Sequence, residues 1–158
     1  MNSLDISLKL SDESDLDSLR EIAENELVRT TLFRGCSVGD FFGHPSERKR
    51  LCLDVPVHFT ARDIADNEIV GGASLVNDEI CYFVAPPLWG KGYGKRIAYF
   101  ALQEAIALKP EPWHLNIDRH NIASRVIAEK LGFRFMGLRH QMYPYKMVFL
   151  HYLFMEHG

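Results

Sequence analysis

Apolar and polar residues alternate along the chain with two different periods, which predict where strands and helices form. Residues 6–10 are apolar at every second position, as expected of a short strand. Apolar residues then recur at steps of three and four, which predicts a helix that begins after an N-cap at Ser11 and ends near Asn25. Its apolar stripe is Leu16, Leu19, Ala23 and Leu27, and the acids expected to face water are Asp15, Asp17, Glu21 and Glu24.

The pattern weakens over residues 29–54, where glycines and a proline interrupt it. This composition predicts a loop with a short helix near residues 46–51. Phe41 and Phe42 need apolar surface to cover them, so we expect packing for these two and for Trp89, with an aromatic-lined acceptor tunnel as the alternative.

A series of strands follows this loop. Residues 57–61, 68–76 and 79–85 read as strands, and Asn77 with Asp78 forms a two-residue hairpin loop between the second and third of them. The three strands therefore predict an antiparallel meander. Pro86 and Pro87 end it, because proline lacks the amide hydrogen that a central strand needs.

The C-terminal half alternates helices and strands. The pattern predicts a helix around residues 97–108, a strand over 113–117, a helix from Asn121 to Leu131 that Gly132 ends, and strands over 133–136 and 147–155. The strand–helix–strand unit from 79 to 117 should be a right-handed parallel crossover. The predicted fold is thus a single α/β domain, residues 1–158, with a mixed sheet of about seven strands flanked by helices.

Composition and charge narrow the class of protein. The 158 residues are 47% apolar and 25% charged with a net charge of -3, as in an ordinary globular domain. The chain starts with acidic residues instead of a signal sequence, and no apolar run approaches the roughly 18 residues of a membrane span. Cys36, Cys52 and Cys81 lie far apart, which predicts neither a metal site nor a set of disulfides. We therefore expect a cytoplasmic protein without a membrane partner.

Charge is unevenly distributed along the chain. Residues 1–30 hold eight acidic and three basic residues, whereas residues 91–146 hold ten basic and four acidic ones. The basic half could attract an anion, or it could be a solvated surface. A phosphate- or RNA-binding module remains a hypothesis from this feature alone, although the net charge does not favour a nucleic-acid partner.

The segment WGKGYGKR lies between a predicted strand and a predicted helix. Glycines allow backbone amides to face outward, and the amides of a first helical turn have no partner within the helix, so phosphate is a natural ligand. The spacing does not match a P-loop or a dinucleotide fingerprint. The candidate binding residues are Trp89, Gly90, Lys91, Gly92, Tyr93, Gly94, Lys95 and Arg96.

The same loop, following EICYFVAPP, resembles the acyl-coenzyme-A loop of the GNAT N-acetyltransferase superfamily. Gly92 and Gly94 match the glycines of that pattern. Trp89 replaces its leading Gln or Arg, as is usual in the branch similar to the ribosomal-protein acetyltransferases of the RimJ/RimL type. That branch also ends its last helix with a pattern that is matched by Asn121, Ser124, Glu129, Lys130, Leu131, Gly132, Phe133 and Gly137. The resemblance covers about residues 68–138.

The resemblance implies that acetyl-CoA is a co-substrate and that no metal is needed. The pyrophosphate would lie on the amides of residues 90–95, and the pantetheine arm would pair with the strand at Phe83 and Val84. Asn121 and Ser124 would face the thiol end. From the residues alone, the preferred interpretation is that Asn121 is a helix cap and that Ser124 is a polar residue of the first helical turn.

For catalysis, the resemblance implies direct acetyl transfer to an amine in a ternary complex. The backbone N–H of Val84 or a neighbour would bind the oxyanion, and Ser124 would hydrogen-bond the leaving sulfur. Ala128 stands where many members of the superfamily have a tyrosine as general acid. Candidates for the base are Glu79, acting through a water, and, more weakly, His58, His140 and Tyr143.

Two functions of different kinds are compatible with this sequence. The first is an acetyl-CoA-dependent N-acetyltransferase whose acceptor is a protein N-terminus or a small-molecule amine. The second is a non-catalytic acyl-CoA sensor or adaptor on the same fold, which the missing tyrosine would explain. The last strand, MVFLHYLFM, is apolar at both sets of alternating positions, which predicts cover on both faces, either within the monomer or by the second subunit of a homodimer.

Overall fold

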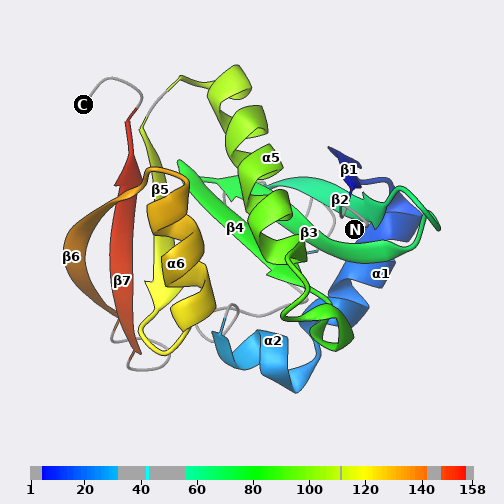
Figure 1. Cartoon of the computed structure of the whole chain (residues 1–158), viewed down its shortest axis with the longest axis horizontal. Helices are drawn as coiled ribbons and strands as arrows, with labels where there is room; N and C mark the ends of the chain where they lie inside the picture. Colours follow the sequence, from blue (N-terminus) through cyan, green and yellow to red (C-terminus); the bar gives the residue numbers. More distant parts are fainter. Residues whose placement is uncertain (1–4, 32–41, 43–55, 111, 142–146, 156–158) are drawn as a thin grey trace, which may run out of the picture.

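The central element of the fold is one mixed sheet of strands in the order β1-β2-β3-β4-β5-β7-β6 (Figure 1). The computed structural model describes residues 5–31, 42, 56–110, 112–141 and 147–155, and within them the sheet has seven strands. The strands are β1 Ile6–Leu10, β2 Val57–Asp63, β3 Ile69–Val76, β4 Glu79–Val84, β5 Trp113–Asp118, β6 Arg134–Gln141 and β7 Met147–Phe154. The helices are α1 Glu13–Ala23, α2 Glu26–Thr31, α5 Tyr93–Leu108 and α6 Ile122–Lys130, with a 3₁₀ turn η1 at Pro86–Leu88. The predicted α/β mixed-sheet class is confirmed.

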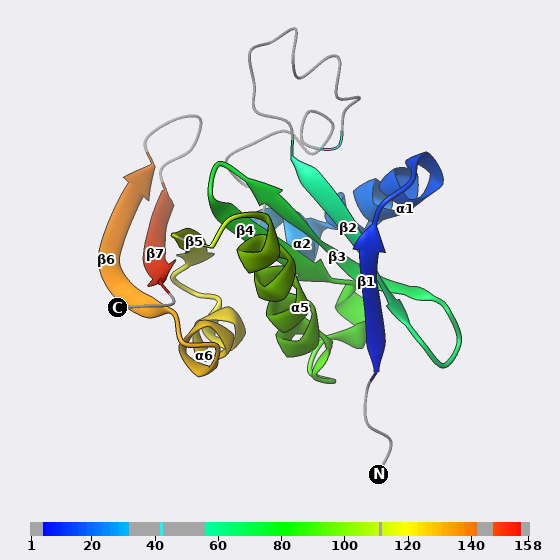
Figure 2. The same ribbon diagram turned by 90° about the horizontal axis from the view of Figure 1, so that it is seen from above.

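Helices cover both faces of this sheet (Figure 2). Ile97 and Ala101 of α5 belong to the main core together with Ile80 of β4 and Leu115 of β5. On the opposite face, Phe83 of β4 belongs to a second core with residues of α1 and α2. Because successive side chains of a strand point to opposite faces, the even-numbered residues of β4 face α5 and α6, and the odd-numbered ones face α1 and α2.

Within the described residues one neighbouring pair of strands, β4 and β5, runs parallel, and it lies in the middle of the sheet. The predicted hairpin at Asn77 and Asp78 joins β3 to β4, and both residues adopt the left-handed conformation, with φ of 49° and 64°. Helix α5 then crosses over and brings β5 alongside β4 in the parallel direction, as predicted. The remaining strand pairs are antiparallel.

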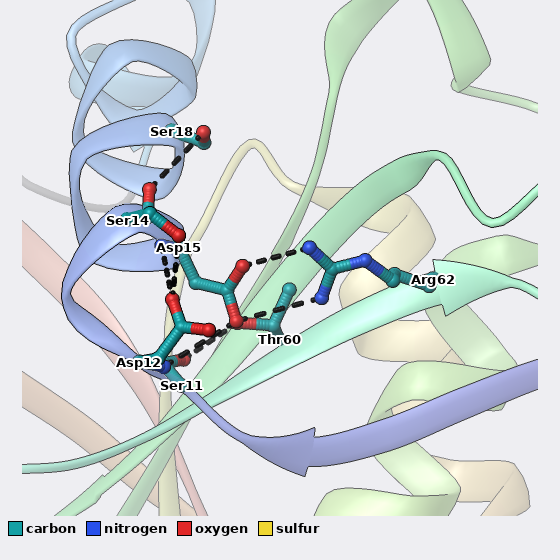
Figure 3. A network of polar contacts seen from close by, with 7 residues as sticks. All are labelled: Ser11, Asp12, Ser14, Asp15, Ser18, Thr60 and Arg62. Carbon is teal, nitrogen blue, oxygen red and sulfur yellow. Dashed lines mark hydrogen bonds and ion pairs between the residues drawn. The ribbon is translucent and has the colours of Figure 1, made fainter.

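The predicted start of α1 is wrong by one residue. Asp12, not Ser11, is the N-cap: its side chain accepts a hydrogen bond from the Asp15 amide at 2.8 Å, and the Asp15 carboxylate accepts one from the Asp12 amide at 3.3 Å. Ser11 instead shares a hydrogen bond of 2.7 Å with the Thr60 hydroxyl on β2 (Figure 3).

Asp15 was expected to face water, but only 5% of its surface is exposed. The Arg62 guanidinium on β2 donates a hydrogen bond of 2.7 Å to the Asp15 carboxylate (Figure 3). This hydrogen bond is the main reason why the pKa of Asp15 lies below its ordinary value. The helix also ends earlier than predicted, at Ala23, so Leu27 belongs to α2 and is 54% exposed.

At the other edge of the sheet, β6 is longer than predicted and pairs with β7 along its length. Leu150 and Tyr152 of β7 are buried on one face of the sheet. Phe149, His151 and Leu153, on the opposite face, are half-buried. Homodimer formation stays a prediction. The predicted short helix near residues 46–51 and the side chain of Phe41 lie outside the described residues, whereas Phe42 is buried and stacks on His58.

Candidate active site

Strands β4 and β5 separate at the centre of the sheet. Within the described residues their pairing is limited to Glu79 opposite His114. The Ala85 amide donates to Val70 of β3 at 2.9 Å, so the odd-numbered residues at this end of β4 direct their backbone groups toward β3. The backbone groups of Tyr82 and Val84 therefore point into the gap beside β5, where the Val84 carbonyl accepts a hydrogen bond of 2.8 Å from Trp89 Nε1.

A cleft of about 770 Å³ occupies this gap and extends to the N-terminal ends of α5 and α6. Most of the residues that the sequence predicts to bind a cofactor line it. These are Phe83, Val84, Trp89, Gly90, Gly92, Tyr93, Gly94, Lys95, Asn121 and Ser124. Lys91 and Arg96, also predicted, do not line this cleft.

The N-terminus of α5 at the cleft differs from those of α1 and α6. Asp12 caps α1, and Asn121 caps α6 by accepting a hydrogen bond of 3.2 Å from the Ser124 amide. The N-cap of α5 is Gly92, at φ 94°, and no side chain caps it. The first amides of a 16-residue helix therefore remain available to a ligand, and Lys95 lines the cleft beside them.

Tyr93 lines the cleft and also makes a structural contact. Its hydroxyl donates a hydrogen bond of 2.6 Å to Asp63 at the end of β2. This contact raises the pKa of Tyr93 and lowers that of Asp63. It ties the first turn of α5 to the antiparallel half of the sheet and so fixes the position of the loop over the cleft.

Glu79 lies on the face of the sheet that α1 and α2 cover. Asn116 Nδ2 donates a hydrogen bond to Glu79 Oε1, and Cys81 Sγ lies 3.8 Å from Oε2. Burial raises the pKa of Glu79 above its ordinary value of 4.5, and the contacts with Asn116, Cys81 and Arg139 offset part of this rise. Glu79 itself does not line the cleft, but Asn116 and Cys81 do, and Asn116 Oδ1 is buried without a partner among the described residues.

Next to Glu79 on the same face lie two stacked histidines. His114 Nδ1 and His151 Nε2 are 2.7 Å apart, and Arg139 Nη2 is 3.1 Å from the same His151 nitrogen. Burial, followed by the charge of Arg139, lowers the pKa of both histidines, so both are neutral near neutral pH.

On the opposite face, Ser124 and Tyr82 line the same cleft from α6 and β4. The Tyr82 hydroxyl is buried and has no hydrogen-bond partner among the described residues. Burial raises the pKa of Tyr82 to about 12, and the neighbouring Ser124 hydroxyl offsets part of the rise. Ala128, which stands where many members of the superfamily have a tyrosine, is fully buried in the main core.

The other candidates for the base lie away from this cleft. His58 Nδ1 is 2.7 Å from the Ser74 hydroxyl on β3. His140 is exposed on β6, and Tyr143 lies outside the described residues. Trp89 was expected to pack, but it is 46% exposed and lines the cleft. Its indole N–H donates a hydrogen bond to the Val84 carbonyl.

Tyr82 and Asn116 are among the cleft residues that the sequence analysis did not predict as site residues. Asn116 is a polar residue between the buried residues Leu115 and Ile117 of a central strand. That position was a detectable signal, because a polar group in such a strand needs a partner or a function. Tyr82 carried no such signal, because a tyrosine in a strand is ordinary and its unpaired hydroxyl is a property of the folded chain.

Two features are absent from the part of the chain that the structure describes. No three side chains among those residues are grouped as ligands for a metal ion. None of the described helices has the length and apolar character that crossing a bilayer requires.

A mixed sheet that opens between its parallel strands, beside an uncapped helix N-terminus, is the arrangement of an N-acyltransferase fold that holds an acyl carrier. The chain belongs to the GNAT acetyltransferases: the model of the family described as "Acetyltransferase (GNAT) domain" matches residues 8–134. The family predicted from the sequence is thereby confirmed. No curated protein matches the chain in sequence.

Solved structures of acetyltransferases share this fold at low sequence identity. Spermidine N-acetyltransferase from Vibrio cholerae, in complex with CoA and spermine, is 17% identical, with 93% of this chain and 94% of that chain covered and a TM-score of 0.74. Ribosomal-protein-S5-alanine acetyltransferase from Vibrio fischeri is 14% identical, with coverages of 100% and 97% and a TM-score of 0.74. An aminoglycoside acetyltransferase in complex with coenzyme A is 18% identical, with coverages of 96% and 95% and a TM-score of 0.74.

Proposed function

We propose that this protein is an acetyl-CoA-dependent N-acetyltransferase that moves the acetyl group directly to a primary amine in a ternary complex. The observation that carries the proposal is the cleft between β4 and β5. It has uncapped helix amides and Lys95 at one end, and polar side chains on both faces of the sheet at the other. Acetyl-CoA supplies an activated acyl group on a thiol leaving group, and the chain supplies binding and orientation.

The residues of the cleft fit such a donor. The amides after Gly92 and the ammonium of Lys95 suit a pyrophosphate, because the helix dipole adds positive charge there. Gly90 is at φ 79°, and an added Cβ would meet nothing within 4 Å, so the loop is open on that side. The backbone groups of Tyr82 and the carbonyl of Val84, which point into the gap, suit the amides of a pantetheine arm.

The two faces of the sheet divide the chemical tasks. Glu79 and Asn116 lie on the α1/α2 face, and Ser124 lies on the α5/α6 face. In this mechanism Glu79 takes the proton of the attacking amine through a water, and Asn116 Oδ1 accepts a hydrogen bond from that amine. The Val84 amide stabilises the negative charge on the carbonyl oxygen, and Ser124 hydrogen-bonds the sulfur as the C–S bond breaks. Overall, the amine nitrogen loses one proton and the released thiol gains one, so the reaction balances.

Separation of the base from the leaving-group donor has a physical advantage. The amine attacks the thioester from one face of the sheet, and the thiol leaves toward the other. No covalent intermediate on the protein is needed, and holding the two reactants in the correct orientation supplies much of the acceleration. The raised pKa of Glu79 also brings this carboxylate closer to the basicity that proton abstraction requires.

The acceptor we propose is a protein N-terminus or a small-molecule amine, in a branch like that of the RimJ/RimL enzymes. This choice rests on the Trp89 and Asn121–Ser124 patterns, and the names of the structural neighbours add polyamines and aminoglycosides as amines to test. A cytoplasmic location is part of the same proposal.

A screen for release of free thiol from acetyl-CoA tests the proposal. The panel contains peptides with free α-amino groups, lysine, spermidine and an aminoglycoside, and calorimetry with coenzyme A runs in parallel. Amine-dependent thiol release that Glu79→Gln strongly reduces is the expected result. Binding of coenzyme A without thiol release across the panel would favour the sensor or adaptor instead, and no binding at all would remove both.

A further inference from the structure

Tyr82 is a cleft residue to which the mechanism above assigns no task. Its side chain projects from β4 toward α5 and α6, since it shares a face with Ile80 and Val84. A Cβ added at Gly94, in the first turn of α5, would lie 4.0 Å from Tyr82 Cε2 and 3.5 Å from Ile127 Cδ1 of α6. The ring therefore lies near the first turn of α5 and near α6, where it lines the cleft.

The hydroxyl of this ring is unusual because it is buried and unpaired. Other buried hydroxyls in the described part of the chain have partners, such as Tyr93 Oη with Asp63 and Thr60 Oγ1 with Ser11. Tyr82 Oη has none among the described residues. A buried polar group without a hydrogen bond costs free energy, so an unpaired hydroxyl in a cleft indicates that a ligand atom is its partner.

The position of Tyr82 indicates which part of a ligand that atom belongs to. Tyr82 lies two residues before Val84 on β4, and therefore about 6–7 Å deeper in the cleft than Val84, away from the glycine loop. At this depth Ser124 lines the same cavity from α6, without a hydrogen bond to the Tyr82 hydroxyl but near enough to lower its pKa slightly. Two uncharged hydroxyls converge there, on the face of the sheet opposite Glu79.

We propose that Tyr82 and Ser124 together form the binding site for the sulfur of the acyl donor, with both hydroxyls donating hydrogen bonds to it. The inference rests on the proposed function and adds to it a second residue at the leaving group. Negative charge develops on sulfur as the C–S bond breaks, so these hydrogen bonds strengthen in the transition state. Tyr82 keeps its own proton throughout, because a phenol with a pKa of about 12 does not ionise near neutral pH.

Calorimetry with two ligands isolates the contact to sulfur. The ligands are coenzyme A and desulfo-coenzyme A, which lacks the sulfur atom, and the proteins are wild type, Tyr82→Phe, Ser124→Ala and the control Tyr99→Phe. Tyr99 lies on α5, is 48% exposed and does not line the cleft. Tyr82→Phe and Ser124→Ala should each raise the Kd for coenzyme A by about threefold to tenfold, which corresponds to the loss of one ordinary hydrogen bond. Both should leave desulfo-coenzyme A unchanged, and Tyr99→Phe should alter neither ligand.

The midpoint of thermal unfolding gives a second, independent measurement. Tyr82→Phe removes a hydroxyl that has no hydrogen-bond partner among the described residues, so the variant should be as stable as wild type or more stable. A marked loss of stability would show that the hydroxyl has a structural partner and would overturn the proposal. The kcat for amine acetylation should fall in Tyr82→Phe while the KM for the amine stays the same.

The outcomes separate this inference from the proposed function. Unchanged coenzyme A binding in Tyr82→Phe overturns the role of Tyr82 and leaves the acetyltransferase proposal standing. An equal loss for both ligands also overturns it, because the contact would then lie elsewhere than at sulfur. If wild type binds neither ligand, the proposed function itself is wrong.

Discussion

Two glycines with nearly the same φ angle allow the role of the glycine loop to be measured separately from its strain. Gly92 is the N-cap of α5 at φ 94°, and Gly132 follows α6 at φ 92°. An alanine at a left-handed position costs about 1–2 kcal/mol, whichever function the position has. For a chain of this length that loss lowers the melting temperature by about 2–8 °C. Gly92→Ala and Gly132→Ala should therefore destabilise the protein by similar amounts.

Only the first of these variants should affect binding of the donor. Gly92 sets the direction of the uncapped amides at the cleft, whereas a Cβ at Gly132 would meet only Phe154 Cε2, at 3.8 Å. Loss of one charge-assisted hydrogen bond to a pyrophosphate costs about 1.5–3 kcal/mol, which is about tenfold to a hundredfold in Kd. Gly92→Ala should raise the Kd for coenzyme A by that factor, and Gly132→Ala should leave this Kd unchanged.

The assay combines calorimetry with coenzyme A and thermal unfolding of the two variants and wild type. If both variants weaken coenzyme A equally, the loss comes from general strain and not from the loop amides. If Gly92→Ala binds as wild type does, the pyrophosphate lies elsewhere, and the reasoning from the uncapped helix is wrong. Unequal losses of stability would contradict the assumption that strain at the two glycines is the same.

Further predictions concern charge and pH. Because burial raises the pKa of Glu79, the rate of acetylation should rise with pH through a value above 4.5, and Glu79→Gln should remove this dependence from a pH–rate profile. Lys95→Gln should weaken coenzyme A by roughly two- to fivefold in calorimetry at low salt, and Lys91→Gln, outside the cleft, should act as the neutral control. Asp15→Asn should lower the free energy of unfolding by about 1–3 kcal/mol at neutral pH, because Arg62 loses its charged partner. Since the pKa of Asp15 is lowered by folding, the stabilisation is present above the ordinary value of 3.8 and is lost as pH falls through the folded-state pKa, so urea titrations of the two proteins should converge in acid. A difference that persists in acid would contradict the assignment of the Asp15–Arg62 pair.

Much of the fold could be predicted because the relevant signals are local. The Asn77–Asp78 hairpin, the Asn121 cap and the left-handed Gly132 follow from neighbouring residues and appear in the structure as expected. The start of α1 could not be decided in this way. Ser11 and Asp12 are both good N-caps, and the choice depends on Thr60 of β2, which binds the Ser11 hydroxyl from 49 residues away.

The candidate site divides along the same line. The sequence by itself indicated the glycine loop, the succession of strands and helices along the chain, and the family, because spacing along the chain carries that information. Only the tertiary structure decided that Asp15 pairs with Arg62, 47 residues away, and that Asn116 holds Glu79 across a separation of 37 residues. The register between distant strands sets which polar side chains share a face and lose contact with water. Burial, unpaired hydroxyls and shifted pKa values follow from that register, so they arise only when the sheet has formed.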